Sequence, residues 1–264
     1  MDLSFLKNLK IELEPVVEKA GEIIMEVYES DHAINEKSDG SPVTEADTKS
    51  EKIIVPAIKR ICPNIPIISE ENSDSHKFNV DGPFFLVDPL DGTKEFLKKD
   101  GKGAFTVNIA LIKNDVPVFG MVHAPALKRS FSGIVGDGSV EKNDAQSTVI
   151  KVSESKKLNI IAVASASHRD DKTNKWLKSN KIKRTISVGS SLKFCLLATG
   201  EADVYPRFAP TMEWDTAAGD AILRAAGGIV TDTSCTKEFK YGKKNFRNNG
   251  FIAWGKYRPQ KELK

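Results

Sequence analysis

Apolar residues recur every three to four positions near the start of the chain, at Leu13, Val16, Val17, Ala20, Ile23, Ile24 and Val27. This period predicts an amphipathic helix over 15–28, because Pro15 suits the first turn of a helix. After a polar loop, the spacing of Thr44 and Asp47 is that of a capping box and predicts a second helix to about Arg60. Asp47 then lies in the first turn of that helix.

The next part of the chain alternates between apolar runs and turn-forming residues, which is typical of strands. We expect strands over 65–69, 84–88, 104–112, 116–123 and 130–135. Their short connections predict an antiparallel arrangement. The polar stretch 141–157 follows and is the best candidate for a boundary, which divides the chain into 1–154 and 155–264.

In the second half, strands and helices alternate along the chain. We expect strands over 159–164, 185–188 and 202–205, helices over 171–180, 192–199 and 216–226, and final strands at Ile229 and Phe251. This alternation predicts an α/β half that follows an α+β half.

Composition and charge exclude several classes of protein. With 264 residues, 40% of them hydrophobic, the chain is long enough for one large domain or two smaller ones. No apolar run approaches the roughly 18 residues of a membrane-spanning helix, and the N-terminus lacks the layout of a secretory signal, so we expect a cytoplasmic protein. Cys62, Cys195 and Cys235 are widely spaced, so we expect buried thiols without a disulfide or zinc site.

The net charge of +3 is too small to imply that nucleic acid is the partner. The Lys/Arg-rich region 237–264 is expected to be a solvated surface. Peripheral contact of this basic region with an anionic membrane surface stays an open alternative.

Candidate chemistry begins where the expected strand 84–88 ends. Asp88 stands at its carboxyl end, and Pro89 biases Asp88 towards an extended conformation. Asp88 and Asp91, with the Leu90 carbonyl between them, form an all-oxygen set that suits Mg²⁺. If a short helix begins at Gly92, its N–H groups would meet a phosphate. Taken alone, this segment is equally compatible with a surface turn, because Asp, Pro and Gly are common turn formers.

Two other segments place carboxylates in comparable positions. Glu70 and Glu71 follow the expected strand 65–69, a placement that suits metal ligation but is also common at solvated strand ends. Asp215 precedes the expected helix 216–226, where an ordinary N-cap is the simpler interpretation of that residue by itself.

Taken together, these segments resemble the inositol-monophosphatase superfamily. The chain contains both signatures of that superfamily in the expected order, Asp-Pro-Leu-Asp-Gly-Thr at 88–93 and Trp-Asp-x-Ala-x-Gly at 214–219. Thr-Glu-Ala-Asp at 44–47 and Ser-Glu-Glu at 69–71 extend the resemblance over nearly the whole chain. The resemblance implies the layered αβαβα sandwich of the sugar-phosphatase fold, an α+β and α/β architecture with the active site between its halves.

The resemblance also implies a Mg²⁺-dependent phosphomonoesterase that uses two or three ions and is commonly inhibited by lithium. The implied metal ligands are Glu70, Asp88, the Leu90 carbonyl, Asp91, Asp215 and, through water, Glu71. The implied catalytic residues are Asp47 and Thr93: the hydroxyl contacts the attacking water and the carboxylate takes up its proton. By itself, Asp47 could instead be only the acid of the capping box.

Three further segments resemble the 3'(2'),5'-bisphosphate nucleotidases within this superfamily: 91–96, 189–195 and 205–208. Inositol monophosphatases usually have Thr-Asn-Phe after Asp-Gly-Thr, where this chain has Lys-Glu-Phe. The resemblance places the substrate at Gly92, Thr93, His168, Gly189, Ser190, Lys193 and Arg207. The charges agree, because a second phosphate needs cationic donors such as Lys193 and Arg207.

The implied reaction is removal of the 3'-phosphate from adenosine 3',5'-bisphosphate, which gives AMP and phosphate and clears a by-product of sulfate activation. One alternative is a phosphatase for inositol phosphates or fructose bisphosphate. Another is a non-catalytic regulatory protein that binds Mg²⁺ or phosphate. The resemblance is compatible with a monomer or a homodimer.

Overall fold

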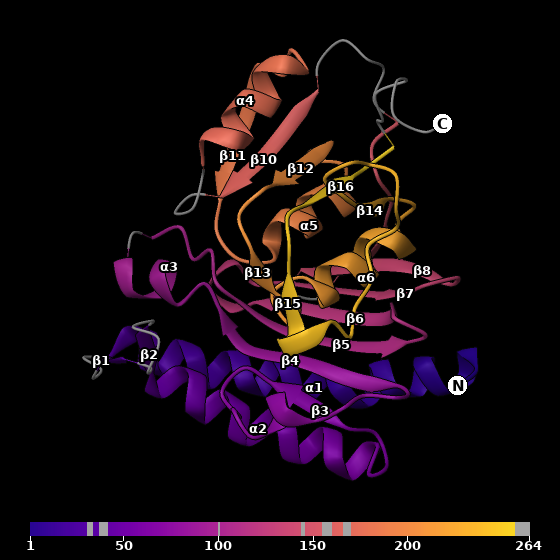
Figure 1. Cartoon of the computed structure of the whole chain (residues 1–264). Coiled ribbons are helices and arrows are strands. Elements are labelled where there is room, and N and C mark those ends of the chain that lie inside the picture. The colour runs from indigo at the N-terminus through magenta and orange to yellow at the C-terminus, as the bar shows by residue number, and fades with distance from the viewer. Residues whose placement is uncertain are drawn as a thin grey trace.

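Helices and sheets alternate in five layers across the molecule, as Figure 1 shows. The computed structural model describes residues 1–30, 34–36, 42–99, 101–143, 146–154, 160–165 and 170–256. From one side to the other, the layers are α1 with α2, a seven-stranded sheet, α5 with α6, a five-stranded sheet, and α4. This order confirms the expected αβαβα sandwich.

Helix α1 (Leu3–Glu29) is longer than its sequence pattern predicts. It begins after Asp2, whose carboxylate accepts a hydrogen bond from Phe5 N at 2.9 Å. The prediction that the helix starts near Pro15 was wrong, and Pro15 lies inside the helix. Leu6, Leu9 and Leu13 continue the buried face on the N-terminal side of Pro15. Burial of this face therefore outweighs the hydrogen bond that proline cannot donate.

Helix α2 (Glu45–Ile61) has the capping box that the sequence predicts. Thr44 is the N-cap, and its Oγ1 accepts from Ala46 N at 3.1 Å. In return, Asp47 Oδ2 accepts from Thr44 N at 2.8 Å. The short strands β1 (Ile34–Glu36) and β2 (Pro42–Thr44) pair just before this helix.

The large sheet has the order β3-β4-β5-β6-β7-β8-β9. Only β3 and β4 run parallel, and the other neighbours pair antiparallel. The strands are β3 (Ile67–Ser69), β4 (Phe84–Asp91), β5 (Thr106–Lys113), β6 (Val116–Ala124), β7 (Arg129–Ile134), β8 (Gly138–Asn143) and β9 (Gln146–Ile150). The first five agree closely with the predicted strands.

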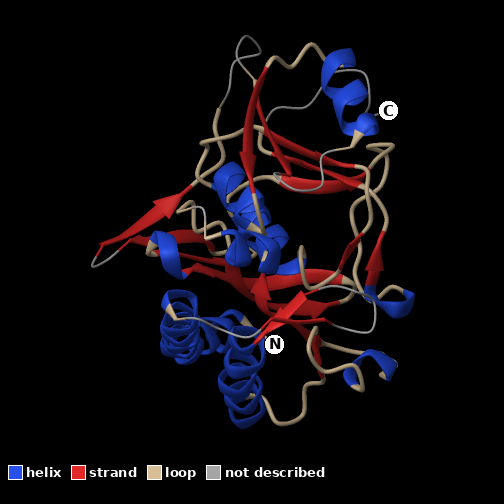
Figure 2. Ribbon diagram, turned by 90° about the vertical axis from the view of Figure 1, so that its left-hand side faces the viewer, coloured by secondary structure: helices blue, strands red, loops and turns tan. Residues whose placement is uncertain are grey.

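The hairpin of β8 and β9 occupies most of the stretch that the sequence predicts as a boundary. Figure 2 shows it projecting from the edge of the large sheet. Four of the five β9 residues are exposed, so the strand lacks the alternation of apolar and polar positions by which a half-buried strand is recognised. The division at residue 154 itself stays a prediction.

The small sheet has the order β11-β10-β12-β16-β14. Its strands are β10 (Ile161–Ser165), β11 (Arg184–Val188), β12 (Val204–Arg207), β14 (Ile229–Asp232) and β16 (Phe251–Trp254). Helices α5 (Leu192–Ala198) and α6 (Ala217–Ala225) lie between the two sheets, and α4 (Asp171–Ser179) covers the outer face of the small one. Strands β13 (Thr211–Met212) and β15 (Arg247–Asn248) pair antiparallel in a separate two-stranded sheet.

Apolar side chains fill the spaces between the layers. One cluster packs α1 and α2 on the large sheet, a second surrounds α5 and α6, and a third lies under α4. All seven residues of α5 are buried, as a helix between two sheets requires. The three cysteines are buried and free, as predicted. Short 3₁₀ helices are η1 (Ser75–Lys77), η2 (Pro125–Leu127) and η3 (Lys244–Phe246).

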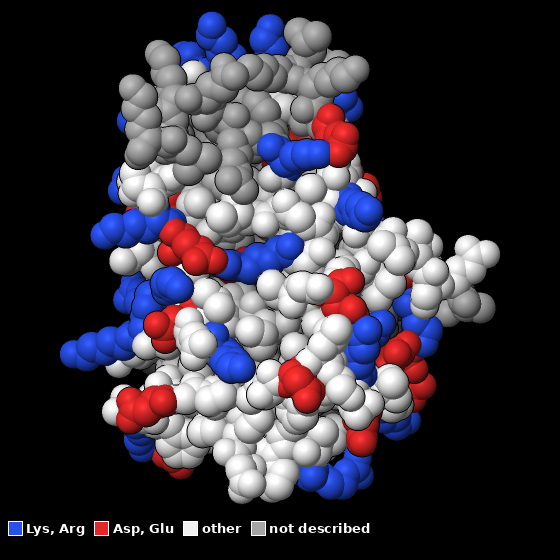
Figure 3. Space-filling model, turned by 90° about the vertical axis from the view of Figure 1, so that its right-hand side faces the viewer, with Lys and Arg blue, Asp and Glu red and all other residues white. Residues whose placement is uncertain are grey.

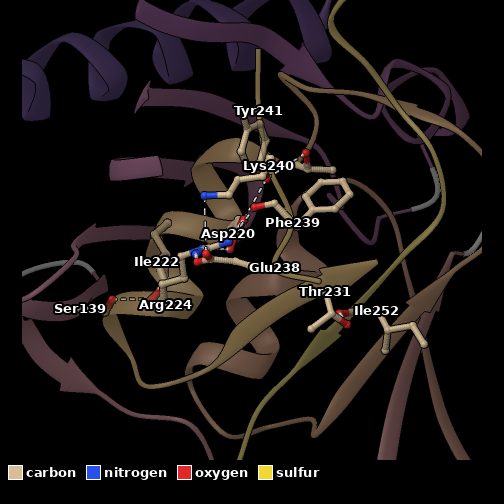
Figure 4. A network of polar contacts seen from close by, with 11 residues as sticks. Ser139, Asp220, Ile222, Arg224, Thr231, Glu238, Phe239, Lys240, Tyr241 and Ile252 are labelled. Atoms are coloured by element: carbon tan, nitrogen blue, oxygen red, sulfur yellow. Dashed lines mark hydrogen bonds and ion pairs between the residues drawn. The ribbon is translucent and has the colours of Figure 1, made fainter. Parts of the chain in front are cut away.

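A buried polar network ties α6 to the chain that follows β14, and Figure 4 shows its side chains. Arg224 pairs with the fully buried Asp220 at 2.7 Å and also with Glu238. The hydroxyl of Tyr241 donates to the Asp220 carboxylate at 3.0 Å. Asp220 is thus neutralised by partners within the protein.

On the face that Figure 3 shows, the basic and acidic side chains of the described residues are interspersed. In the basic C-terminal region, Lys240, Lys243 and Lys256 pair with Glu238, Glu213 and Glu154. The Lys240 and Lys256 pairs fit a solvated surface, whereas Lys243 pairs with the fully buried Glu213. Among the described residues, no helix has the length and hydrophobicity of a membrane span.

Candidate active site

A bulge in strand β4 brings two carboxylates to one face of the large sheet. Asp88 pairs with Asn108 and Asp91 with Thr106, so Pro89 and Leu90 stand opposite one residue of β5. In a regular strand, residues three positions apart point to opposite faces of the sheet. The extra residue of the bulge turns Asp88 and Asp91 to the same face. Asp88 and Asp91 can therefore act on the same ligand.

Glu70, Asp88 and Asp215 form a carboxylate cluster. Each offers an oxygen, and these oxygens lie within 4.8 Å of one another. Glu70 follows β3 and stays paired with β4, because its N–H donates to Val87 O. Asp88 is fully buried, whereas Glu70 and Asp215 are half-buried. In the part of the chain that the structure describes, the cluster contains neither Glu71 nor Asp91.

Asp91 lines the same cavity as Glu70 and Asp215. Its Oδ2 accepts from Ser191 N at 2.6 Å and from Asn108 Nδ2 at 3.3 Å. The Ser191 hydroxyl in turn donates to Asn108 Oδ1 at 2.7 Å. These contacts fix one oxygen of Asp91 and orient the carboxylate towards the cavity.

Burial and mutual repulsion perturb two of these acids. Burial, opposed by the Lys193 charge and assisted by the Glu70 charge, raises the pKa of Asp91 to about 6. Burial, together with the charges of Asp91 and Glu70, holds the pKa of Asp215 well above its usual range. Among the described residues, neither Asp91 nor Asp215 makes an ion pair within 4 Å. A bound cation would relieve this repulsion.

Asp215 lies in the turn that leads into α6 but is not the N-cap of that helix. Thr216 occupies the N-cap position, and the Asp215 carboxylate accepts from Met212 N at 2.8 Å. The single-residue interpretation as an N-cap was therefore wrong. The neighbouring Glu213 is fully buried and anchors this turn by accepting from Gly242 N and Lys243 N.

Asp47 caps helix α2 and also contacts Thr93, the residue with which the resemblance pairs it. Its Oδ2 accepts from both the N–H and the hydroxyl of Thr44, each at 2.8 Å. Its Oδ1 faces Thr93, whose hydroxyl lies 3.4 Å away and also 3.3 Å from the Leu90 carbonyl. The cap holds one oxygen of Asp47 and leaves the other directed at Thr93.

Helix α3 (Thr93–Lys98) begins at the position that the sequence indicates. Gly92 is its N-cap, with a left-handed φ of 91°. A side chain on Gly92 would also approach the Ala104 carbonyl at 3.0 Å and the Ser190 Cβ at 3.3 Å. Glycine is therefore required both by the conformation and by the close approach of the 189–191 loop.

A cavity of about 310 Å³ opens beside the carboxylates, between the two halves of the chain. It contains most of the predicted substrate residues: Gly92, Thr93, Gly189, Ser190, Lys193 and Arg207. Lys94, Glu95, Tyr205 and Met212 also line it. His168, which the sequence predicts at this site, lies outside the described residues.

Lys193 has a more restricted position than its predicted role suggests. The side chain is buried, and Nζ donates to the Ser190 carbonyl and, at 3.4 Å, to the Val188 carbonyl. Nζ also lies 5.4 Å from the centre of the Tyr205 ring. Burial lowers the pKa of Lys193 to about 8, with the Asp91 carboxylate opposing that shift. The ammonium group thus holds the 188–190 loop as well as lining the cavity.

Sequence reasoning missed Asn108 and Ser191, which contact Asp91. Asn108 and Thr106 are buried polar residues within the otherwise apolar strand β5, and this was an available signal. Ser191 belongs to the segment 189–195 that resembles the nucleotidases, but its contact with Asp91 was not predicted, because the two residues are 100 positions apart.

The donor set fits a hard divalent cation. It consists of carboxylate and carbonyl oxygens only, and the described cavity lining has no histidine or cysteine. Such oxygen ligands suit Mg²⁺ and disfavour softer metals. The raised pKa values of Asp91 and Asp215 identify negative charge that a cation would neutralise.

Comparison with known proteins identifies the family of this chain. The model of the inositol monophosphatase family matches residues 6–261. A 3'(2'),5'-bisphosphate nucleotidase CysQ of Salmonella typhimurium is 41% identical over 235 residues, covering 88% of this chain and 94% of that protein. A protein of the same name from Buchnera aphidicola is 41% identical over 241 residues, with 89% of each chain covered.

Solved structures agree with the sequence relatives. A crystal structure of CysQ from Bacteroides thetaiotaomicron has a TM-score of 0.80 at 36% identity and covers 97% of this chain and 100% of that one. An inositol monophosphatase from Thermotoga maritima has a TM-score of 0.75 at 26% identity, with 94% and 92% covered. The fold and site define a phosphatase of the layered-sandwich type. The chain belongs to the inositol monophosphatase family.

Proposed function

We propose that this protein is a Mg²⁺-dependent 3'(2'),5'-bisphosphate nucleotidase that removes the 3'-phosphate of adenosine 3',5'-bisphosphate. The name of the relatives that are 41% identical supports this substrate class. The reaction produces AMP and phosphate, and its chemistry is hydrolysis of a phosphomonoester by water.

The observation that carries the substrate assignment is the contact between the segments that resemble nucleotidases. A Cβ on Gly189 would lie 2.6 Å from Glu95 Cγ, so the 189–195 segment packs directly on the 91–96 segment. Arg207, from the third segment, lines the same cavity. Residues that distinguish this subfamily thus meet at one place, beside the carboxylates.

Glu70, Asp88, Asp91, Asp215 and the Leu90 carbonyl are the proposed ligands for two or three Mg²⁺ ions. When bound, the metal would supply an activated water and neutralise charge that develops on the phosphate and leaving oxygen. The carboxylates orient the ligand set, and Ser191 and Asn108 hold Asp91 in place. Glu71 is proposed to act only through water, because it lies outside the cluster.

Asp47 is the proposed general base, acting with Thr93. Its buried Oδ1 faces the Thr93 hydroxyl, and its Oδ2 is held by the capping box. A carboxylate fixed in this way can accept a proton from a water that contacts Thr93. The helix cap therefore positions the base.

The cationic side of the cavity is proposed to hold the second phosphate. Arg207 is half-buried, and its guanidinium donates to the Ala209 and Pro210 carbonyls at 3.3 and 3.4 Å. These long bonds leave guanidinium donors available for a phosphate. Lys193 contributes positive charge nearby, while it holds the loop.

The test compares phosphate release with Mg²⁺ from adenosine 3',5'-bisphosphate, inositol 1-phosphate and fructose 1,6-bisphosphate. We expect strong selectivity for the nucleotide, which Arg207→Ala reduces through KM. A preference for either sugar phosphate would retain the phosphatase site and contradict the substrate assignment. Tight binding without turnover would favour a non-catalytic binding protein.

A further inference from the structure

A stacked pair of aromatic rings links two of the proposed metal-ligand segments. The His76 ring lies on the Trp214 indole with centroids 4.7 Å apart and an angle of 24° between the planes. His76 belongs to η1, which follows the Glu70 segment, whereas Trp214 directly precedes Asp215. The stack thus joins a segment of the N-terminal half to one of the C-terminal half.

His76 also holds the residue next to Glu70. Its Nε2 lies 2.8 Å from the Ser69 carbonyl oxygen, and because a carbonyl only accepts, this nitrogen donates. The neighbouring Ser75 hydroxyl accepts from Ser69 N at 3.1 Å. The 3₁₀ helix η1 therefore fixes both backbone polar groups of the residue that precedes Glu70.

The indole of Trp214 depends on packing for its position. It is buried, yet its Nε1 makes no hydrogen bond to any residue that the structure describes. The His76 ring therefore supplies a directional contact that the indole otherwise lacks. Aromatic stacking of this kind has preferred geometry and contributes beyond its buried area.

The cluster has to be held together against charge repulsion. The oxygens of Glu70, Asp88 and Asp215 lie within 4.8 Å of one another. Like charges at that separation repel one another, and the repulsion is stronger inside a protein than in water. Glu70 and Asp215 come from different halves of the chain, so a link between their segments is needed to keep the site formed before a cation enters.

We propose that His76 is a positioning residue that preorganises the divalent-cation site by clamping the Glu70 segment to the Asp215 segment. The inference rests on the proposed metal site and adds a residue that none of the sequence signatures contains. His76 acts through Ser69 and Trp214, and it does not act on the substrate.

The test measures Mn²⁺ binding to the substrate-free protein by electron paramagnetic resonance of the free ion. Three variants separate the contacts: His76→Phe keeps a ring on Trp214, His76→Gln keeps a donor for Ser69, and His76→Ala removes both. Lys77→Ala is the matched control, because Lys77 is in the same short helix but is exposed, and Asp74 is its only ion-pair partner among the described residues.

We expect His76→Ala to raise the Mn²⁺ dissociation constant about 3- to 10-fold, below the 10- to 100-fold typical of residues bonded directly to a ligand. His76→Phe and His76→Gln should fall between it and the wild type, and Lys77→Ala should bind like the wild type. At saturating Mg²⁺, the kcat of His76→Phe should stay within about twofold of wild type, because the clamp acts on metal affinity.

Unchanged Mn²⁺ affinity in all three His76 variants would overturn the inference, even if their melting temperatures fall. A wild-type protein that binds no Mn²⁺ would instead contradict the proposed metal site itself. These two failures are distinguishable, because the measurement requires neither substrate nor turnover. If His76→Ala does not fold, the comparison of His76→Phe with Lys77→Ala decides the question.

Discussion

Asp215 and Asp220 lie only five positions apart along the chain and have opposite surroundings. Asp220 is fully buried and is neutralised by Arg224 and the Tyr241 hydroxyl (Figure 4). Asp215 faces the cavity, and burial together with the nearby charges of Asp91 and Glu70 raises its pKa. Removing the partner of an acid that is paired within the protein destabilises the fold, whereas acids that repel one another across a cavity are suited to bind a cation.

The two sites also differ in how much of the chain builds them. Arg224 and Asp220 are on one helix, four residues apart. The carboxylate cluster needs the ends of β3 and β4 from one half and the turn before α6 from the other. A local pair forms with its helix, whereas the cluster exists only after the layers have assembled.

Asp215→Asn should give the largest effect that distinguishes the carboxylate cluster from the Asp220 network. Removing a metal-binding charge worth several kcal/mol should lower Mg²⁺-dependent kcat/KM by about 10³- to 10⁵-fold. The melting temperature should hold or rise, because the substitution relieves repulsion. Phosphate release from adenosine 3',5'-bisphosphate and thermal unfolding measure both effects. Retention of more than a tenth of wild-type activity would contradict the role of Asp215.

Asp47→Asn tests the acid that has both a structural and a catalytic position. We expect kcat to fall by about 10²-fold, the lower part of the range for general-base catalysis. Thr44→Ala is the matched control: it removes the cap hydroxyl, costs about 1 kcal/mol of stability and spares the base. If both variants lose the same stability and the same activity, Asp47 is only a capping residue.

Asp220→Asn should show the opposite behaviour to Asp215→Asn. It leaves the buried Arg224 charge without its main partner and should cost about 3 kcal/mol, the lower end for a broken buried pair, because Glu238 remains. The melting temperature should fall by roughly 6–12 °C. Below that temperature kcat should be unchanged, and a large loss of kcat with normal stability would remove the distinction between the sites.

The pH dependence of stability gives a smaller test. Burial raises the pKa of Asp91 from 3.8 to about 6, so its contribution to stability is present below pH 3.8 and lost as pH rises through about 6. Without divalent cations, the melting temperature of Asp91→Asn minus that of wild type should therefore be larger well above pH 6 than well below it. With excess Mg²⁺, this difference should instead be smaller above pH 6 than below it, because the cation stabilises the wild type and not the variant. A difference that is independent of pH would show that Asp91 is not perturbed.

The sequence indicated most of the fold because its signals are local. The Thr44 and Asp47 capping box and the apolar strand before Asp88 all have the predicted form. Pro15 misled the prediction of α1, because the buried face that Leu6, Leu9 and Leu13 form before it keeps the helix continuous through the exposed proline. Strand β9 was missed because an exposed edge strand has no apolar side to reveal it.

The site was harder to predict from the sequence than the fold, because its contacts join residues that are far apart along the chain. The bulge that turns Asp88 and Asp91 to one face depends on pairing with β5. The contact of Ser191 with Asp91 and the stack of His76 on Trp214 join segments that only the packed layers bring together. Sequence motifs identified the carboxylates, and tertiary structure was needed to find what positions them.

The most direct test of the account is the anomalous scattering of Mn²⁺ in crystals of the wild-type protein. The account predicts Mn²⁺ peaks within ligand distance of Glu70, Asp88 and Asp215 and no peak at Asp220. Peaks elsewhere, or a carboxylate cluster that stays without Mn²⁺ at saturating concentration, would contradict the claim that these acids form the metal centre of a phosphatase.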